Sequence, residues 1–288
     1  MTKIGIIGQG FVGSAVREGM KEYYDIAAFD KDPDKLSTRA SIHDVVENTE
    51  LTFLCVPTPM KKSGECDLRI LTSALDEIEA SVNDLNKENY IVIIKSTVPP
   101  GTTESLNMRY SSIDIVFNPE FLTEANAIDD YKNQTRIIVG GERPSSTVVK
   151  QLFQKAFPKV PIIKTSATIA EMIKYVTNTF LTTKVLFANE MYQICKGLDI
   201  DYDKVIEYAR YDERLGHSHW AVPGTDGHFG AGGSCFPKDI QALIFHAKSL
   251  GIDPKLLEGV WAKNLEVRPE RDWENLKGRA VSDDMTTI

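Results

Sequence analysis

Apolar residues follow two different patterns along this chain. Up to about residue 140, short apolar runs alternate with helix-like stretches, which is typical of a parallel, doubly wound α/β sheet of the Rossmann type. The runs that we interpret as strands cover residues 3–7, 24–29, 51–56, 90–95, 113–117 and 136–140. Because ligands bind at the carboxyl ends of parallel strands, polar residues just after these runs are candidates for a site.

From residue 167 to 196 the apolar period becomes that of a helix, without proline or glycine. Its apolar positions include Ile169, Met172, Ile173, Val176, Phe180, Val185 and Met191. At 1.5 Å per residue this helix would be roughly 45 Å long, so we expect a spine between domains and a homodimer formed through residues 166–197. Shorter helices are expected over 202–211, from 237 to about 250 and from 254 to about 275, with Pro269 as a candidate break.

The expected organisation is therefore an N-terminal doubly wound α/β domain over residues 1–165 and an all-helical central domain over residues 166–275. The polar residues 276–288 look like a frayed tail.

One glycine motif indicates the ligand of the first domain. Gly8, Gly10 and Gly13 form the pattern G-x-G-x-x-G between a strand and a helix, and Asp30 follows at the end of the next strand. This arrangement predicts a dinucleotide site, in which the pyrophosphate lies at the helix N-terminus and the carboxylate binds the ribose hydroxyls. A carboxylate at Asp30 repels a 2′-phosphate and favours NAD over NADP, although the neighbouring Lys31 weakens that preference. The full set that we assign to the cofactor is Gly8, Gly10, Phe11, Val12, Gly13, Asp30, Lys35, Val56, Thr58, Thr97 and Glu124.

Several of these residues stand at strand ends. Thr58, Thr97, Glu120 and Glu124 each follow an apolar run, where a ligand of a parallel sheet would bind. The alternative is that they are ordinary loop and cap residues.

The stretch 229–239 is the strongest candidate for chemistry in the second domain. Gly230, Gly232 and Gly233 precede Cys235, and Pro237 is typical of the first turn of a helix. A helix N-terminus favours the thiolate, which is the reactive form of cysteine. The alternative is a structural cysteine beside a flexible loop.

Two residues on the spine helix are a second candidate. Lys174 and Asn178 lie at i and i+4, so they share one face of the helix. Their apolar neighbours favour partial burial, and the alternative is an ordinary surface pair.

Composition excludes several classes of function. The net charge is −8 without a basic run, which argues against nucleic acid or an anionic membrane as a partner. No apolar run reaches the roughly 20 residues needed to span a bilayer, and the N-terminus lacks the layout of a signal peptide. The scattered cysteines, Cys55, Cys66, Cys195 and Cys235, indicate a reduced, cytoplasmic protein without disulfides or a zinc ribbon. His217 and His219 have no further ligands at suitable spacing, so we expect no metal.

Six motifs in order resemble one known family. They are Gly8-x-Gly10-x-x-Gly13 with Asp30, Val56-Pro57-Thr58-Pro59, Ser96-Thr97-Val98-Pro99-x-Gly101-Thr102, Asn118-Pro119-Glu120-Phe121-Leu122-x-Glu124, Ala170-Glu171-x-x-Lys174-Tyr175-x-x-Asn178 and Gly232-Gly233-Ser234-Cys235-x-Pro237-Lys238-Asp239. From Lys3 to about Asn275 the chain is similar to the UDP-glucose/GDP-mannose dehydrogenase family, and within it to the UDP-glucose 6-dehydrogenase branch.

The resemblance implies a reaction and residues for it. The C6 alcohol of a nucleotide sugar, with UDP-glucose favoured, is oxidised by two NAD⁺ to a carboxylate through a thiohemiacetal and a thioester on Cys235. It implies that Lys174 and Asn178 stabilise an oxyanion and that Asp239 supports the water and Lys174. It also implies that Glu120 carries protons, that Glu124 lies near the substrate and the water, and that Thr97 lies near the nicotinamide and the water. The implied substrate contacts are Glu120, Phe121, Leu122, Lys174, Asn178, Phe229, Gly230 and Gly232, with Arg214 reaching the substrate of a second subunit.

The chain also departs from the family pattern. Members of the family continue into a third, UDP-binding domain, whereas this sequence stops at Ile288. Residues 279–285 echo a loop of that domain, with Arg279 where a substrate-binding lysine would stand. Two alternatives stay open. A two-electron β-hydroxyacid-type dehydrogenase also places a lysine and an asparagine one turn apart on a central helix, and the missing domain would favour a catalytically inert NAD-binding partner subunit.

Overall fold

The computed structural model describes residues 3–283, and the chain divides into two compact units. The first comprises residues 3–58 and 68–174, and the second comprises residues 59–67 and 175–283. The segment 59–67 thus belongs with the second unit, although it lies far from it in sequence. Each unit is described by itself.

A seven-stranded sheet forms the centre of the first unit, in the order β2-β1-β3-β4-β5-β6-β7. The strands are β1 (Lys3–Ile7), β2 (Asp25–Phe29), β3 (Leu51–Leu54), β4 (Tyr90–Ile94), β5 (Ile113–Phe117), β6 (Ile137–Gly140) and β7 (Ile162–Thr165). β2 and β3 lie on opposite sides of β1, so the strand order reverses there. Such a switch point opens a crevice at the carboxyl ends of the strands, where the loop after β1 lies.

The expectation of a wholly parallel sheet was wrong at one pair. β5 and β6 run antiparallel and meet at their ends, where Phe117 pairs with Gly140. The connection between them holds the short helix α5 (Ala127–Lys132). The edge strand β7, which runs parallel to β6, was missed by the sequence pattern.

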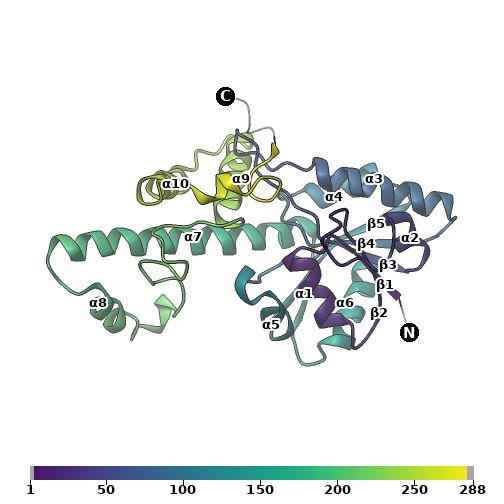
Figure 1. The fold of residues 1–288 in the computed structure, drawn as a ribbon, viewed down its shortest axis with the longest axis horizontal. Helices are drawn as coiled ribbons and strands as arrows, with labels where there is room; N and C mark the ends of the chain where they lie inside the picture. Colours follow the sequence, from purple (N-terminus) through teal and green to yellow (C-terminus); the bar gives the residue numbers. More distant parts are fainter. Residues whose placement is uncertain (1–2, 284–288) are drawn as a thin grey trace. The chain divides into compact units, whose positions relative to one another are not determined.

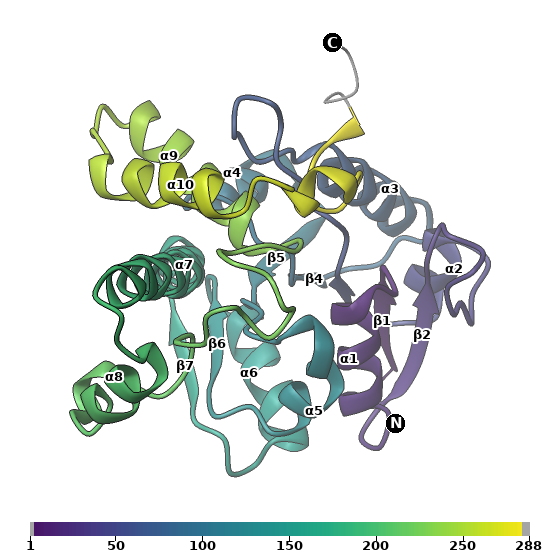
Figure 2. The same cartoon turned by 60° about the vertical axis from the view of Figure 1, so that its left-hand side comes forward.

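Helices cover both faces of this sheet, as predicted (Figures 1 and 2). On one face α1 (Phe11–Met20), α5 and α6 (Ser145–Ala156) bury a cluster that includes Ile4, Ile6 and Phe53. On the other face α2 (Ile42–Glu47), α3 (Arg69–Asp84) and α4 (Thr102–Arg109) bury a cluster that includes Ile7, Leu54 and Ile94. Successive strand residues point to opposite faces, which explains why fully apolar strands are needed here.

The long helix α7 (Ala167–Gly197) confirms the helix predicted over residues 167–196. It runs uninterrupted for 31 residues and ends at the first glycine after its start. Its residues up to Lys174 belong to the first unit, and those from Tyr175 belong to the second. In the part of the chain that the structure describes, neither α7 nor any other helix has the length and apolarity needed to cross a membrane.

The second unit is built on the remainder of α7. α8 (Tyr202–Ala209) packs against it through Ala188 and Cys195, and α9 (Phe236–Ser249) with α10 (Lys255–Val267) packs through Leu186. The pair α9 and α10 lies side by side in Figure 2. The predicted helix 254–275 ends at Val267, two residues before Pro269, because the residue before a proline disfavours helical dihedrals. A short 3₁₀ turn, η3 (Asp272–Asn275), follows it.

The expected frayed tail was wrong for the residues that the structure describes. Met60 donates a backbone hydrogen bond to Ala280 O (2.8 Å) and accepts one from Ser282 N (2.9 Å). Ala280 and Val281 are buried with Met60 and Trp273 in an apolar cluster, so packing against the segment 59–67 orders this stretch. Of the echo at 279–285, Asp284 and Met285 lie outside the described residues, as does the rest of 284–288.

Candidate functional site

The glycine loop after β1 has the geometry that a dinucleotide needs. Gly8 has φ +89°, and a Cβ on it would lie 2.6 Å from Cys55 O. A Cβ on Gly13 would lie 1.8 Å from Gly8 O, whereas one on Gly10 would meet no atom within 4 Å. Gly8 and Gly13 are thus required by the turn, and Gly10 leaves a bare surface at the start of α1. No side chain caps that helix end, so its N–H groups fit an anion.

The predicted acidic residue lies beside this loop. One carboxylate oxygen of Asp30 accepts a hydrogen bond from Gln9 N (2.5 Å), and the other accepts one from Asp32 N (2.9 Å). Each carboxylate oxygen can accept a second bond, so the pair of ribose hydroxyls fits there. Phe11 and Val12 are half-buried in the first turn of α1, and Lys35 is exposed in the loop after β2. The residues present therefore fit a dinucleotide.

The ends of β3 and β4 are joined by two hydrogen bonds. Thr58 Oγ1 donates to Thr97 O (2.7 Å), and Ser96 Oγ donates to Val56 O (2.5 Å). The structure therefore brings the predicted residues Val56, Thr58 and Thr97 together at neighbouring strand ends.

Glu120 lies at the end of β5 in a charged, buried setting. Its Oε1 accepts hydrogen bonds from Phe121 N (2.6 Å) and Leu122 N (3.1 Å). Lys95 Nζ lies 3.0 Å from Oε2, yet this oxygen accepts no hydrogen bond of suitable geometry from the residues that the structure describes. The ion pair leaves Oε2 with an unused acceptor.

Lys95 itself was missed by sequence reasoning. It is 4% exposed, and its Nζ also donates to Asn118 Oδ1 (2.8 Å). A lysine in an apolar strand, two residues before Thr97, is the signal that could have identified it, because a buried lysine needs a partner.

Lys174 on α7 reaches the same strand end. Its Nζ donates to Glu120 O and lies 5.5 Å from the centre of the Phe121 ring. The structure thus brings together Glu120, Phe121, Leu122 and Lys174 within the first unit. Glu124, by contrast, is exposed at the start of the 3₁₀ turn η1 (Glu124–Asn126).

One turn before Lys174, Glu171 caps α4. Its carboxylate accepts hydrogen bonds from Gly101 N (2.6 Å), Thr103 N (2.8 Å) and Thr103 Oγ1 (2.6 Å). Burial raises the pKa of Glu171, and these hydrogen bonds oppose the rise. Glu171 therefore ties α7 to the loop that follows Thr97.

In the second unit Cys235 is the N-cap of α9, as predicted. Asp239 lies one turn further on, and its N–H donates to Cys235 O (3.0 Å). The Asp239 carboxylate accepts a hydrogen bond from Asn178 Nδ2 (2.5 Å) and pairs with Lys238 Nζ (2.5 Å). Burial alone would lower the pKa of Lys238, but the negative groups around it, Asp239 first, raise its pKa overall. Asn178, Asp239 and Lys238 are therefore one connected group, and Lys238 was not among the predicted residues.

The predicted loop residues differ in exposure. Gly230 is buried, Gly232 is half-buried and Phe229 is 38% exposed, with its ring 5.6 Å from that of Tyr192. Arg214 lies on the 3₁₀ turn η2 (Glu213–Leu215), pairs with Asp212 and has an 88% exposed side chain.

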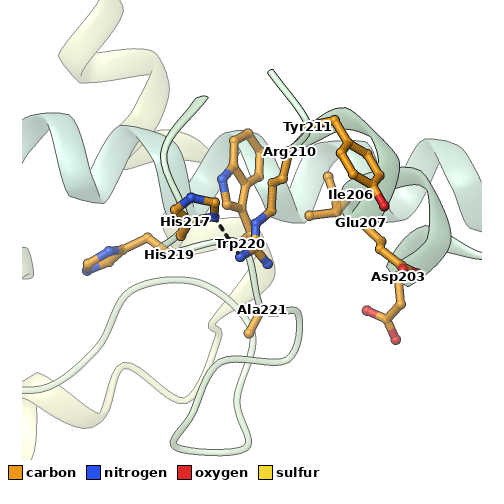
Figure 3. Close-up of a pocket in the computed structure, with 9 residues that line it drawn as sticks. All are labelled: Asp203, Ile206, Glu207, Arg210, Tyr211, His217, His219, Trp220 and Ala221. Carbon is orange, nitrogen blue, oxygen red and sulfur yellow. Dashed lines mark hydrogen bonds between the residues drawn. The ribbon is translucent and has the colours of Figure 1, made fainter. Parts of the chain in front are cut away.

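A pocket of about 600 Å³ lies elsewhere in the second unit, at the end of α8 (Figure 3). It is lined by Asp203, Ile206, Glu207, Arg210, Tyr211, His217, His219, Trp220 and Ala221. None of the predicted catalytic or binding residues lines it. His217 Nδ1 pairs with Arg210 Nη2 at 3.1 Å, and within residues 3–283 no group of three or more histidine, cysteine or acidic side chains is placed to hold a metal ion.

The strand order, the glycine loop and Asp30 define the first unit as a dinucleotide-binding domain. The chain belongs to the UDP-glucose/GDP-mannose dehydrogenase family: the family's NAD binding domain matches residues 27–157 and its central domain matches residues 168–266. The loop 8–13 lies outside the matched residues, so its assignment rests on its own geometry.

Individual relatives agree with this family. The UDP-glucose 6-dehydrogenase of Rickettsia bellii (strain RML369-C) is 35% identical over 240 residues, which are 81% of this chain and 53% of that protein. The GDP-mannose 6-dehydrogenase of Pseudomonas syringae pv. tomato (strain ATCC BAA-871 / DC3000) is 35% identical over 242 residues, 80% of this chain and 54% of that protein. A solved UDP-glucose dehydrogenase from Pyrobaculum islandicum is 28% identical, with a TM-score of 0.84, and the match covers 96% of this chain and 70% of that one. The chain thus spans about half the length of these two curated relatives.

Proposed function

We propose that this protein oxidises the C6 alcohol of a nucleotide sugar to a carboxylate in two NAD-dependent steps. The observation that carries the proposal is Cys235 at the N-terminus of α9, after a glycine-rich loop and one turn before an Asp239 that is bonded to Asn178. Family membership supports the same reaction class. A cysteine is useful in this reaction because it can hold an aldehyde covalently between two oxidations.

In the proposed sequence, NAD⁺ supplies the hydride acceptor for each oxidation. The first oxidation converts the C6 alcohol to an aldehyde and releases a proton. The Cys235 thiolate then adds to the aldehyde carbon, and the new oxyanion takes up a proton to give a thiohemiacetal. The second oxidation removes the remaining C–H hydride and the hydroxyl proton, leaving a thioester. Water attacks the thioester carbon, Cys235 leaves as the thiolate, and a carboxylate is released.

The first unit contributes a proton acceptor and a cation to this proposal. Glu120 Oε2 has an unused acceptor beside Lys95, which suits a carboxylate that takes protons from the alcohol or the water. Lys174 is proposed to stabilise the oxyanion, because a buried ammonium beside a developing negative charge lowers its energy. Thr97 is proposed to orient the water.

The second unit contributes a neutral donor. One N–H of the Asn178 amide donates to Asp239, and the amide has a second N–H, which we assign to the oxyanion. The carboxylate of Asp239 fixes the orientation of that amide. Phe229, Gly230 and Gly232 are proposed to bind the sugar nucleotide.

UDP-glucose is the proposed substrate, with GDP-mannose as the competing sugar nucleotide. Support for UDP-glucose comes from the resemblance of the segment 232–235 and from the relatives that carry that name, while other relatives carry the GDP-mannose name. NADH release with UDP-glucose, GDP-mannose and UDP-N-acetyl sugars decides between them.

The reaction itself is tested by stoichiometry and by one substitution. We expect two NADH per sugar consumed, and loss of carboxylate formation in Cys235→Ser. The matched control is Cys195→Ser, since Cys195 lies in the apolar cluster between α7 and α8. One NADH per substrate would favour the two-electron β-hydroxyacid reaction. NAD binding without turnover of any sugar nucleotide would favour an inert partner subunit.

We also propose that the protein forms a homodimer through α7. In the second unit this helix exposes Val176 (53%), Phe180 (67%), Phe187 (52%) and Ile194 (49%) at spacings of four and seven residues, which place them on one face. An exposed apolar stripe of this kind marks an interaction site. Light scattering of the protein and of Phe180→Lys tests the assignment: we expect a dimer that the substitution dissociates, and a monomeric parent would refute it.

A further inference from the structure

The segment before Cys235 has no strand or helix of its own, yet side chains bind its peptide groups. Asn264 on α10 accepts a hydrogen bond from Ala231 N (2.7 Å) and donates one to Ala231 O (2.9 Å). Asn189 on α7 accepts one from Gly230 N (3.1 Å). Asn189 and Asn264 are 2% and 1% exposed, so they replace the partners that a sheet would otherwise supply.

Arg268, at the end of α10, contacts the same segment from one side. Its side chain is 3% exposed, and its Nη1 donates to Phe229 O (3.2 Å). A Cβ on Gly232 would lie 2.1 Å from Arg268 Nη2, 2.2 Å from Cζ and 2.5 Å from Nε. The Gly232 backbone therefore lies directly against the guanidinium group. A side chain at position 232 would therefore require the Arg268 guanidinium to move.

Two carboxylates hold this guanidinium in place. Arg268 Nε donates to Asp272 Oδ1 (2.6 Å), and Nη2 donates to Asp226 Oδ2 (2.8 Å). The second oxygen of Asp272 accepts a hydrogen bond from Gly233 N (2.9 Å). Burial alone would raise the pKa of Asp272, but the bonds from Arg268 and Gly233 lower it overall. Arg268 and Asp272 are therefore both charged at neutral pH, and the two carboxylates hold the planar guanidinium in one orientation.

We propose that Arg268 and Asn264 are positioning residues that set the path of residues 229–233 and, through it, the place of Cys235. The proposal rests on the proposed function for its effect on catalysis, but not for its effect on the loop. A buried arginine that only stabilised the unit would not need to bind peptide groups on both sides of Gly232, and Arg268 with its partner Asp272 binds Phe229 and Gly233. Displacing reacting atoms by about 1 Å can lower a rate roughly 100-fold.

Hydrogen–deuterium exchange without substrate tests the loop directly. We expect Arg268→Met to speed exchange of the amides at Gly230, Ala231 and Gly233 at least about tenfold, while amides in the middle of α9 keep their rates. The matched control is Arg271→Met, since Arg271 lies three residues on with a 47% exposed side chain, and it should leave the loop unchanged. Unchanged loop exchange in Arg268→Met, or an equal rise in loop and helix, would overturn the proposal.

A second pair of variants tests the same contact if Arg268→Met does not fold. Gly232→Ala alone should speed loop exchange, because its methyl group overlaps the guanidinium. In an Arg268→Ala background the same change should add little, since the overlapping atoms are gone. Additive effects in this cycle would contradict the assigned contact.

Activity gives a separate readout. With the sugar nucleotide that the parent oxidises, we expect kcat of Asn264→Ala and Arg268→Met to fall about 100-fold, with Arg268→Lys intermediate, while NAD affinity is unchanged. If Cys235→Ser keeps its activity while the exchange results hold, the proposed chemistry is wrong and the positioning of the loop stands. If Cys235→Ser is inactive and loop exchange is unchanged in Arg268→Met, the positioning proposal is wrong and the proposed chemistry stands.

Discussion

The two units hold their functional loops by different means. In the first unit the loops follow strands, so the backbone hydrogen bonds of the sheet place Gly8, Thr58, Thr97 and Glu120 at neighbouring strand ends. In the second unit the segment 229–233 follows no strand, and polar side chains from α7, α10 and η3 bind its peptide groups. The first arrangement depends on sheet register, whereas the second depends on a few buried polar groups.

This difference predicts where each unit is vulnerable. A sheet distributes its hydrogen bonds over many residues, so a loop at its edge is sensitive mainly to steric changes in the loop itself. A loop held by side chains is sensitive to each of them, because a buried partner left alone is costly. The substitutions below separate these two kinds of sensitivity.

The largest effect is expected from Asp239→Ala in the second unit. This change leaves the buried ammonium of Lys238 without its carboxylate and Asn178 without its acceptor, which should lower the free energy of unfolding by about 3–5 kcal/mol. Urea denaturation measures it. Asp239→Asn, which keeps an acceptor oxygen, should lose less, and a loss below about 1 kcal/mol in the alanine variant would show that the charged group is not critical.

In the first unit, Gly13→Ala is expected to have the next largest effect. Its Cβ would lie 1.8 Å from Gly8 O, so the turn must shift, at about 1–3 kcal/mol. Gly10→Ala is the matched control, because its Cβ would meet no atom within 4 Å. We expect Gly10→Ala to keep the melting temperature while weakening NAD binding in a calorimetric titration. Equal melting temperatures for both variants would contradict the steric account.

The same difference explains what the sequence could predict. Short apolar runs predict the strands, and the ends of these runs place Thr58, Thr97 and Glu120 without further information. The thirty-residue helical pattern was sufficient for α7. The partners of the cysteine segment were not predictable in this way, because Asn264, Arg268 and Asp272 are ordinary helix-surface residues until the chain folds. The apolar pattern likewise does not give the direction of β6, and the packing of residues 276–282 depends on the distant Met60.

Glu171→Gln tests a side-chain contact inside the first unit, whose loops are otherwise placed by the sheet. The amide keeps one acceptor oxygen for Gly101 and Thr103 instead of two, so we expect a loss of about 1 kcal/mol. Because burial raises the folded-state pKa of Glu171, the parent binds more protons folded than unfolded above pH 4.5. Its stability relative to the glutamine variant should therefore fall as the pH rises from about 4.5 through the raised folded pKa. A pH-independent difference between the two proteins would contradict this sign.

Arg214→Ala is expected to have the smallest effect on stability, although Arg214 belongs to the second unit. Its side chain is 88% exposed and pairs only locally with Asp212 among the contacts described, and exposed ion pairs contribute little. Differential scanning calorimetry should show no change in melting temperature. If Arg214 contacts the substrate of a second subunit, as predicted, losing that contact should raise KM without changing the folding stability. A lower melting temperature with unchanged KM would mean that Arg214 supports its own loop, and that the sensitivity of this unit to side chains extends beyond its buried groups.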